Sequence, residues 1–411
     1  MKHPIQNRNF RWLFTSRIFN SLVFGFTEVP LMWWVYQETG QASLVAATAL
    51  IGAIGALLAA PLGGVLADKG SKKNVIILNL AVDVVIMALL IGAVLGGALK
   101  LWGVYLFVAL SALFGNLSGP AMGALVPLVL ERSQYQKGNA LTSLASMLGM
   151  AVSFALAGTA TGALGVAPAL AFGIGFVLLA WLAISFVKEP KVQKEARDTQ
   201  EPPSTSTWLS MGEGFSFVWK TPVLFWLIAV AMLLNLILAP LGALLAPYAK
   251  LLGGTAKDYG LLSSGIFTGQ LIGLSLQNFV KVKKPLPALL AGTWALALSV
   301  GLLAQAPTVW VAVFLLAMFG VAASFMNVQA MTLIQLAVPH EKMGRVFGVV
   351  QGLNMGVQPL GLAAASLFAD TLGPRGIFLI VGILMFIAGF AFLQGPVRAV
   401  LARPATAGGD R

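Results

Sequence analysis

The sequence predicts an all-α polytopic membrane protein with twelve transmembrane helices in two pseudo-symmetric six-helix bundles. Hydrophobic stretches of about 20 residues recur along the chain, and this length crosses a hydrocarbon core of about 30 Å as a helix. Lysine and arginine gather in every second gap between these stretches, as they do in membrane proteins whose loops alternate between two sides. The composition agrees, because 58% of the 411 residues are hydrophobic and only 10% are charged.

The predicted spans occupy most of the chain and leave no room for a soluble catalytic domain. They are expected at 12–36, 43–67, 74–96, 103–130, 139–162, 167–187, 222–249, 258–280, 286–305, 308–337, 346–369 and 376–396. The chain has no cysteine, which excludes disulfides and thiolate chemistry.

The basic residues predict the orientation of the chain. Of the 26 lysine and arginine residues, 21 fall on the side of the two termini, four fall on the opposite side, and Arg17 lies within a span. The positive-inside rule therefore places both termini in the cytoplasm. The same bias explains the net charge of +12, so we expect no nucleic-acid partner.

A change of composition divides the chain near its middle. Residues 188–221 are charged and then rich in Pro, Ser and Thr, which indicates a cytoplasmic linker. Aromatic and apolar residues at its end predict an amphipathic helix on the membrane surface, namely Trp208, Met211, Phe215, Phe217 and Trp219. We therefore expect bundles at 1–187 and 222–398 and a cytoplasmic tail at 399–411.

The two halves resemble each other weakly. The stretch that begins at Pro120 is similar to the one that begins at Gln329, and basic loops follow the second and fourth spans of each half. Two parallel six-helix halves are the plan of a rocking transporter with its site between them. Small-residue spacings on spans 5, 8 and 11 suggest sliding surfaces between the halves, at Gly158/Gly162, Gly265/Gly269/Gly273 and Gly352/Gly356.

Three ionisable residues lie within spans, where charge is costly and function is the default hypothesis. Arg17, Asn20, Ser21, Phe24 and Glu28 share one stripe of span 1, which argues for a polar cavity rather than lipid. Glu28 is a candidate for proton coupling or substrate binding, against a structural hydrogen bond or a water-mediated ion pair with Arg17.

The third intramembrane charge, Asp83 on span 3, lies closer to the cytoplasmic end of its helix. A structural ion pair between Asp83 and Arg17 and a role as a proton relay remain open alternatives.

The second half carries amides in place of buried charges. Asn235, Asn327, Asn354 and Gln358 lie within its spans, and they are further candidates for substrate contacts. With methionine and aromatic residues such as Trp33, Trp34 and Trp226, they suit a large, mostly apolar ligand. Each amide alone is also a common interhelical hydrogen-bonding group.

The turn after span 2 reads Gly-Gly-Val-Leu-Ala-Asp-Lys-Gly-Ser-Lys-Lys over residues 63–73. It resembles the signature loop of the major facilitator superfamily, G-x-L-x-D-[RK]-x-G-[RK]-[RK], with Ser71 in place of a glycine. The matching positions are Gly64, Leu66, Asp68, Lys69, Lys72 and Lys73. The resemblance implies a gating interlock that forms in the inward-closed state and breaks during the transport cycle, against the alternative of a loop that only sets topology.

Further segments resemble the drug-efflux branch that includes macrolide-efflux and enterobactin-exporter proteins. They are residues 7–11, 36–40 and 338–346. The resemblance implies a bacterial inner-membrane, proton-coupled exporter of amphipathic or lipophilic small molecules, for which a monomer suffices. The alternatives are a siderophore or lysolipid exporter or flippase without proton coupling, and a non-transporting sensor on the same scaffold.

Several motifs are absent. The chain has no nucleotide-binding G-x-x-x-x-G-K-[ST], no H-E-x-x-H and no G-x-S-x-G. We therefore expect no enzyme, no catalytic residues, no metal and no cofactor.

Overall fold

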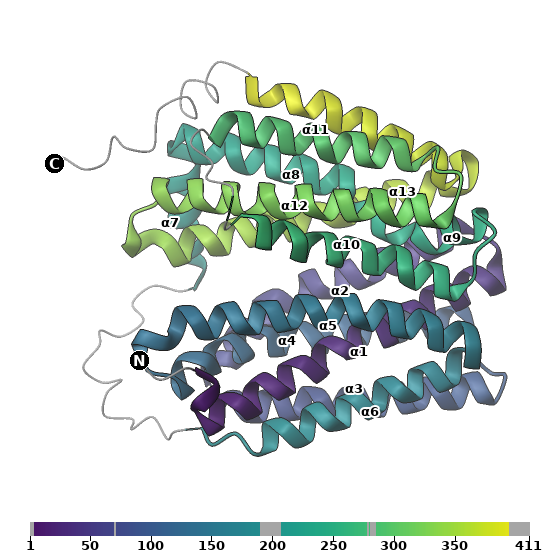
Figure 1. The fold of residues 1–411 in the computed structure, drawn as a ribbon. Helices are drawn as coiled ribbons and strands as arrows, with labels where there is room; N and C mark the ends of the chain where they lie inside the picture. Colours follow the sequence, from purple (N-terminus) through teal and green to yellow (C-terminus); the bar gives the residue numbers. More distant parts are fainter. Residues whose placement is uncertain (1–3, 70, 190–206, 278, 280–284, 394–411) are drawn as a thin grey trace.

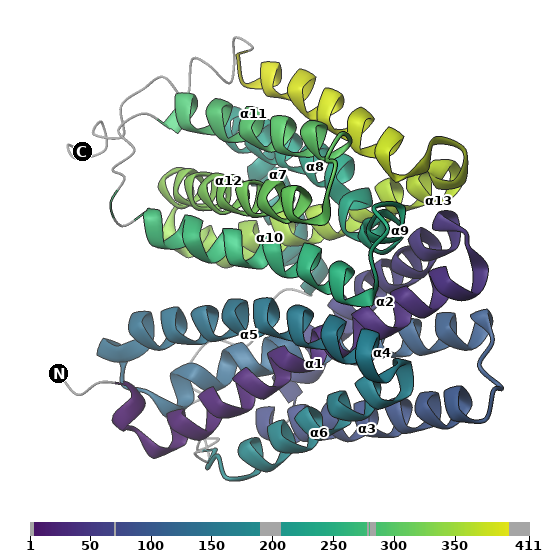
Figure 2. The ribbon, with the colours of Figure 1, turned by 45° about the vertical axis from the view of Figure 1, so that its right-hand side comes forward.

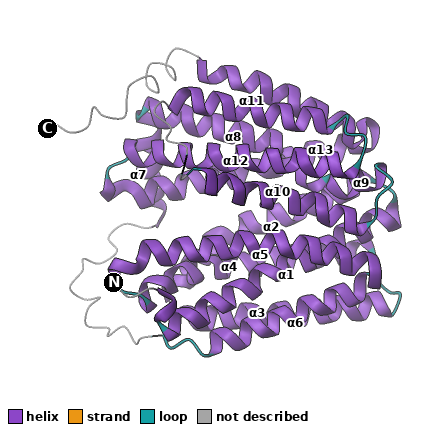
Figure 3. Ribbon diagram, in the orientation of Figure 1, coloured by secondary structure: helices purple, strands orange, loops and turns teal. Residues whose placement is uncertain are grey.

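The computed structural model describes residues 4–69, 71–189, 207–277, 279 and 285–393, and every regular element in them is helical (Figure 3). Within these ranges the side chains of 60–69, 116–118, 120, 207–211, 223, 285–286 and 340 are not described. The N-terminal half has six long helices: α1 (Arg8–Thr39), α2 (Ala42–Lys69), α3 (Lys72–Leu95), α4 (Leu101–Val129), α5 (Tyr135–Leu164) and α6 (Val166–Ser185). Each covers one predicted span.

The C-terminal half begins with the short helix α7 (Thr207–Lys220), the expected amphipathic helix. It continues with α8 (Pro222–Ala243), α9 (Leu245–Leu251), α10 (Ala256–Leu276), α11 (Pro285–Leu303), α12 (Val309–Ala337) and α13 (Met343–Gly389). Short 3-10 turns complete the chain at Pro4–Gln6, Arg132–Gln134, His340–Lys342 and Phe390–Leu393.

Two elements differ from the simple span pattern. The span expected at 222–249 is interrupted at Leu244, which separates α8 from α9 shortly after Pro240. Helix α13 joins the spans expected at 346–369 and 376–396. Its Gly373 has φ 66° and ψ 167°, a conformation that favours glycine, and it is followed by Pro374, so the chain turns there between two helical segments.

The helices form two bundles, α1–α6 and α7–α13, with their long axes running the same way (Figure 1). Helix α1 packs on α5 and α6, and α2 packs on α4; in the other half α10 packs on α12, and α11 on α13. The bundles meet through α5 against α10 and α2 against α13, as both ribbon views show (Figures 1 and 2). Where the linker begins and ends stays a prediction, because 190–206 lie outside the described residues.

The two ends of the molecule differ in charge. The basic end is where α1 begins and α6 ends, and it carries Lys72, Lys73, Arg132 and Arg345; the far end is where α1 ends and α2 begins. The basic loops that the sequence predicts on one side of the membrane thus gather at one end of the two bundles.

Length and apolar composition fit a membrane. In the described part of the chain, 8 helices are long and apolar enough to cross one, and α13 counts once although it contains two predicted spans. Two shorter apolar segments, Leu101–Gly115 and Pro287–Leu303, belong to α4 and α11. The predicted fold class is confirmed.

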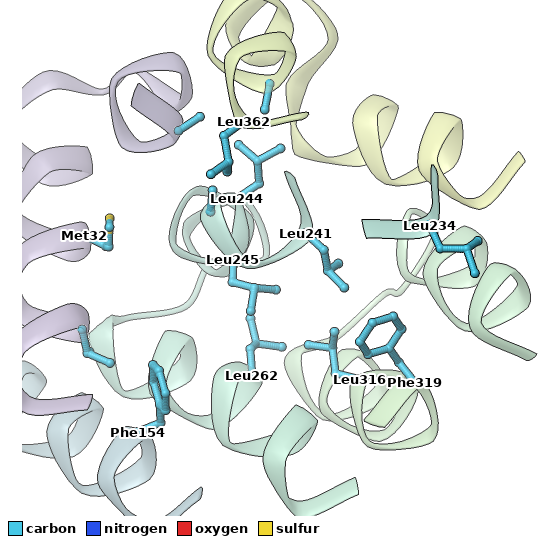
Figure 4. Packing of buried hydrophobic residues seen from close by; sticks show 14 of the residues in the cluster. Met32, Phe154, Leu234, Leu241, Leu244, Leu245, Leu262, Leu316, Phe319 and Leu362 are labelled. Atoms are coloured by element: carbon cyan, nitrogen blue, oxygen red, sulfur yellow. The ribbon is translucent and has the colours of Figure 1, made fainter. Parts of the chain in front are cut away.

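Buried apolar side chains continue from one bundle into the other. Near the break between α8 and α9, Leu244, Leu245 and Leu262 lie in the same packed region as Met32 and Phe154 of the N-terminal half (Figure 4). All five side chains are at most 8% exposed. The two halves are therefore held together by a continuous apolar contact rather than by the linker alone.

Candidate functional site

The polar stripe of α1 lies on a single uninterrupted helix. Asn7 caps its start by accepting hydrogen bonds from the backbone N–H groups of Asn9 and Phe10, and Gly40 ends it in a left-handed conformation. The stripe, however, has two environments. Ser21 is buried against α5, where an added Cβ at Gly149 would meet its hydroxyl, whereas Phe24 is 47% exposed.

Arg17 lies in the part of α1 nearer the basic end. Its Nε donates a 2.8 Å hydrogen bond to Oγ of Ser146 on α5. It also lines a pocket of about 120 Å³ between α1, α4 and α5, together with Leu13, Met122 and Asn139. Asn20, one turn further along α1, is partly buried and forms no hydrogen bond with the described part of the chain. This pocket belongs to the N-terminal half alone.

Glu28 lies beyond this pocket, where α1 approaches α10 of the other half. Its carboxylate interacts electrostatically with the phenol of Tyr259, which is 1% exposed and hydrogen bonded to Ser263. No hydrogen bond or ion pair joins Glu28 to another described residue. Arg17 is eleven positions away, about 16 Å along the helix, so it forms no direct ion pair with Glu28, and the water-mediated pairing stays a prediction.

Aromatic rings connect the same three helices. Phe24 on α1 meets Phe154 on α5 edge to face, with centroids 5.8 Å apart, and Phe154 stacks on Phe267 of α10 at 5.3 Å. The lone carboxylate is thus bordered by an apolar contact that spans both halves. An unpaired charge beside such a contact is costly.

Asp83 is separated from this interface. It accepts a 3.2 Å hydrogen bond from Nδ2 of Asn79, one turn earlier on α3, and α3 packs on α4 and α6 of its own half. The ion pair between Asp83 and Arg17, one of the two alternatives, is not formed between these described residues. The buried Oδ1 of Asn79 has no hydrogen-bond partner among the described residues, so this pair keeps an open acceptor inside the N-terminal bundle.

The amides of the second half fall into two groups. Asn235 on α8 donates to Oδ1 of Asn354 on α13 at 3.2 Å and to the carbonyl of Ala231 at 2.8 Å, so it links two helices. Asn327 and Gln358 are exposed and form no hydrogen bond to the described residues. None of these four amides lines the pocket beside Arg17.

The signature loop is described only in part. The side chains of Gly64, Asp68 and Lys69 lie outside the described residues, and so does the predicted interlock of Asp68. Lys73 is placed, and its Nζ donates to the carbonyls of Ser185, at 2.5 Å, and Val187, at 2.9 Å, at the end of α6. The loop is thereby tied to the last helix of its own half.

Glu189 completes this connection, and the sequence reasoning did not single it out. Its carboxylate accepts hydrogen bonds from Ser71 Oγ and from the backbone N–H groups of Lys72 and Lys73, at 3.0 and 3.2 Å. Burial alone raises the pKa of Glu189, but these hydrogen bonds and the charge of Lys72 hold it below its usual value. No local sequence pattern pairs Glu189 with the start of α3, from which it is more than 100 positions away.

Ser71, which replaces the signature glycine, has φ −62° and ψ 122°, the extended conformation of a helix N-cap. It accepts a hydrogen bond from the Asn74 backbone and donates to Glu189. The substitution therefore adds a cap rather than a strained turn.

The glycine spacings have different roles. Gly158 packs against α10, where an added Cβ would lie 2.8 Å from Cα of Gly260, and this surface joins the two halves as predicted. The ridge at Gly265, Gly269 and Gly273 packs instead against α12 of its own half. At Gly352 and Gly356 an added Cβ meets nothing within 4 Å, so the predicted sliding surface on span 11 is not formed in this conformation.

A second contact between the halves was not predicted from the sequence. The backbone N–H of Ser43 donates to Oδ1 of Asp370 at 3.0 Å, and its hydroxyl donates to Oδ2. The Asp370 carboxylate from α13 thus provides a hydrogen-bond acceptor for a free backbone N–H group in the first turn of α2, at the far end. Asp370 lies outside the predicted spans, and no local sequence pattern pairs it with Ser43.

The fold and this interface define a class, the membrane transporters built from two helical bundles around a shared interface. The chain belongs to this class through a named family, the Major Facilitator Superfamily, whose model matches residues 13–355 and, in a second match, 283–409. It is therefore a multi-pass membrane protein and a secondary transporter of small molecules, not an enzyme.

Two curated proteins are similar in sequence to this chain over most of its length. Macrolide efflux protein A of Streptococcus pyogenes is 24% identical over 368 residues, which cover 87% of this chain and 88% of that protein. The enterobactin exporter EntS of Salmonella typhimurium is 25% identical over 365 residues, with 86% and 84% covered. The predicted family is confirmed, and so is the distant resemblance to a macrolide-efflux protein and an enterobactin exporter.

Solved structures share the fold. A D323A mutant of the nucleoside transporter NupG superposes with a TM-score of 0.78 at 13% identity, covering 94% of this chain and 99% of the other. A bacterial homologue of the iron transporter ferroportin, in its inward-facing state, gives 0.72 at 16% identity, with 94% and 98% covered. At these identities the similarity concerns the fold alone.

Proposed function

We propose that this protein is a proton-coupled exporter of amphipathic or lipophilic small molecules that works by alternating access. The observation that carries the proposal is Glu28, an unpaired carboxylate at the point where α1 meets α10 of the other half. The two relatives whose names include efflux and export support the direction of transport.

The chemistry of Glu28 gives a simple coupling rule. When the halves close around it, an unpaired negative charge is costly, so the carboxyl group must be protonated or must face a cationic substrate. When water reaches it, the proton can leave. Proton and substrate then compete for one group, and the halves can change arrangement only when one of the two is bound, as coupled exchange requires.

The substrate class follows from the remaining polar groups. Asn235, Asn327, Asn354 and Gln358 offer a few hydrogen-bonding points among apolar helices, and Arg17 and Asn20 offer others on α1. A ligand with a large apolar surface and few polar atoms suits such a lining. Asp83 is given a secondary part, because its helix α3 packs on α4 and α6 of its own half and its carboxylate is hydrogen bonded to Asn79.

The basic end is assigned to the cytoplasm. It carries the clustered lysines and arginines and the first residues of α1, and short basic loops stay on the cytoplasmic side. We therefore place the protein in a bacterial inner membrane with both termini in the cytoplasm. A monomer suffices, since both halves of the interface come from one chain.

The competing proposal is export of a siderophore or lysolipid without proton coupling. The similarity to an enterobactin exporter is the specific observation in its favour. Such a transporter needs a site for its ligand but does not need Glu28 to change its protonation state.

The test is uptake of a lipophilic cation into inverted membrane vesicles under an imposed pH gradient. Wild type is compared with Glu28→Gln and, as the matched control, Glu131→Gln, an exposed carboxylate at the basic end. We expect gradient-driven uptake to fall more than tenfold in E28Q and to persist in E131Q. Equal uptake in wild type and E28Q contradicts coupling through Glu28, and absence of uptake in all three contradicts the cationic substrate.

A further inference from the structure

Helix α7 and the start of α13 form a pocket that none of the transport machinery described above uses. Its volume is about 280 Å³, and it lies at the basic end. The side chains that line it are those of Glu213, Ser216, Phe217, Lys220, Lys342 and Arg345. Three of these six side chains are cationic and one is anionic.

The pocket is held in place by close packing beneath α7. Gly214 is buried, and an added Cβ there would lie 2.9 Å from the carbonyl oxygen of Arg345 and 3.1 Å from Val349. Val218, one turn later on the same face, is 4% exposed. Helix α7 therefore docks directly on α13 and positions its own Lys220 beside Lys342 and Arg345.

The opposite face of α7 is aromatic and open. Phe215 is 47% exposed and Trp219 is 64% exposed, and their rings stack with centroids 5.9 Å apart. Trp219 also meets Phe225 at the start of α8, edge to face, at 5.0 Å. Aromatic rings at the end of a transmembrane helix favour the headgroup level of a bilayer. The pocket is thus adjacent to lipid headgroups.

The cations in the pocket are incompletely neutralised. Arg345 pairs with Glu213, but both side chains are about half exposed, and such a pair is weak. Lys342 lies 4.7 Å above the ring of Phe217 and forms no ion pair with a described residue. Lys220 is exposed and has no carboxylate partner in the described part of the chain. The pocket keeps a surplus of positive charge.

From this arrangement we infer that the pocket between α7 and α13 binds the phosphate-bearing headgroup of an anionic phospholipid. Arginine and lysine from two elements converge on one volume, as phosphate recognition requires, and basic pockets at this depth attract anionic headgroups. The bound lipid would hold α7 against the start of α13.

The experiment uses the purified full-length chain in detergent. Its thermal midpoint is followed during titration with short-chain phosphatidylglycerol, with phosphatidylcholine of the same chain length, and with inorganic phosphate. The variant is Lys220→Gln with Lys342→Gln. The matched control is Lys100→Gln with Lys250→Gln, which removes two exposed lysines from the far end.

We expect phosphatidylglycerol alone to raise the midpoint of the wild type. The K220Q/K342Q variant should need about tenfold more of it for the same shift, and the control variant should respond like the wild type. If the double variant does not fold, K220Q alone is compared, with a smaller expected loss. The site is overturned if phosphatidylglycerol shifts the midpoint of the K220Q/K342Q variant as much as that of the wild type. It is also overturned if the control variant loses as much of this shift as the K220Q/K342Q variant. A matching shift with inorganic phosphate overturns the lipid as its ligand.

Discussion

The far end and the basic end of this transporter are held together in different ways. At the far end the two halves touch each other: Gly158 lies against Gly260, and Ser43 donates to Asp370. At the basic end the contacts stay within each half. In the N-terminal half Glu189 accepts hydrogen bonds from the start of α3, and in the C-terminal half α7 packs on α13. Because the contacts between the halves named here, Gly158 with Gly260 and Ser43 with Asp370, lie at the far end, the molecule is closed at that end.

The comparison indicates which contacts must change during a transport cycle. Opening the far end requires that the glycine contact and the Ser43–Asp370 hydrogen bonds break together, because both join the same two halves. The contacts at the basic end lie within the halves and can persist as the halves rock. Because the chain has no cysteine, pairs of introduced cysteines can carry spin labels without background.

The largest effect is expected from Gly158→Leu. The new side chain has no room beside Gly260 and the carbonyl of Ala256, so it should force the far end apart. We expect the distance between spin labels at Gln41 and Leu372 to grow by several ångströms and transport to fall about tenfold or more. Gly175→Leu, where an added Cβ meets nothing within 4 Å, is the control. An unchanged distance in G158L contradicts the closed contact.

The second prediction concerns the signature loop. If Asp68 forms an interlock when the basic end is closed, Asp68→Asn should remove that contact and slow turnover several-fold without lowering the thermal midpoint. Turnover in vesicles and the midpoint in detergent are the two measurements. A turnover rate equal to that of the wild type would leave the loop with a purely topological role.

A smaller shift is expected from Asp370→Asn. The amide keeps the shape of the side chain but removes the charge that caps the first turn of α2. We expect the population closed at the far end to fall about two- to fivefold, as an exposed hydrogen bond of modest strength implies. The label pair Gln41 and Leu372 reports it, and Glu38→Gln at the same end is the control. No change in D370N would mean that the glycine contact alone holds the far end.

The smallest effect is local and depends on pH. Because the pKa of Glu189 lies below its usual value, its carboxylate stabilises the start of α3 at neutral pH, and this contribution is lost as the pH falls through that lowered pKa. Glu189→Gln should increase hydrogen exchange of the amides at Lys72 and Lys73 at pH 7, by about tenfold. The difference from wild type should shrink in acid. Glu131→Gln, an exposed carboxylate at the same end, should leave these amides unchanged.

Most of the fold could be predicted because its cause is local. A stretch of about 20 apolar residues forms a helix in lipid whatever surrounds it, since its backbone groups have no other partners there. The exceptions were also local in origin: Pro240 precedes the break between α8 and α9, and Gly373-Pro374 turns the chain within α13. Neither required knowledge of the other half.

The candidate site was predicted less completely, because charge in a span marks a residue without identifying its neighbours. Glu28, Arg17 and Asp83 were singled out because charge is costly in lipid, yet the direct ion pair offered as one alternative for Asp83 and Arg17 is not formed. Arg17 reaches Ser146, and Asp83 reaches Asn79. Tyr259, which faces Glu28, was not singled out, because a tyrosine near the start of an apolar helix is unremarkable in sequence.

By itself, then, the sequence determined where the chain is helical, the grouping of basic loops at one end and the family to which the chain belongs. These follow from hydrophobicity, charge and a short motif, which are properties of neighbouring residues. Only the tertiary structure decided that Gly158 meets Gly260, that Asp370 caps α2 and that Glu189 caps α3. Each of these contacts joins residues about 100 or more positions apart, and helix packing alone selects such partners.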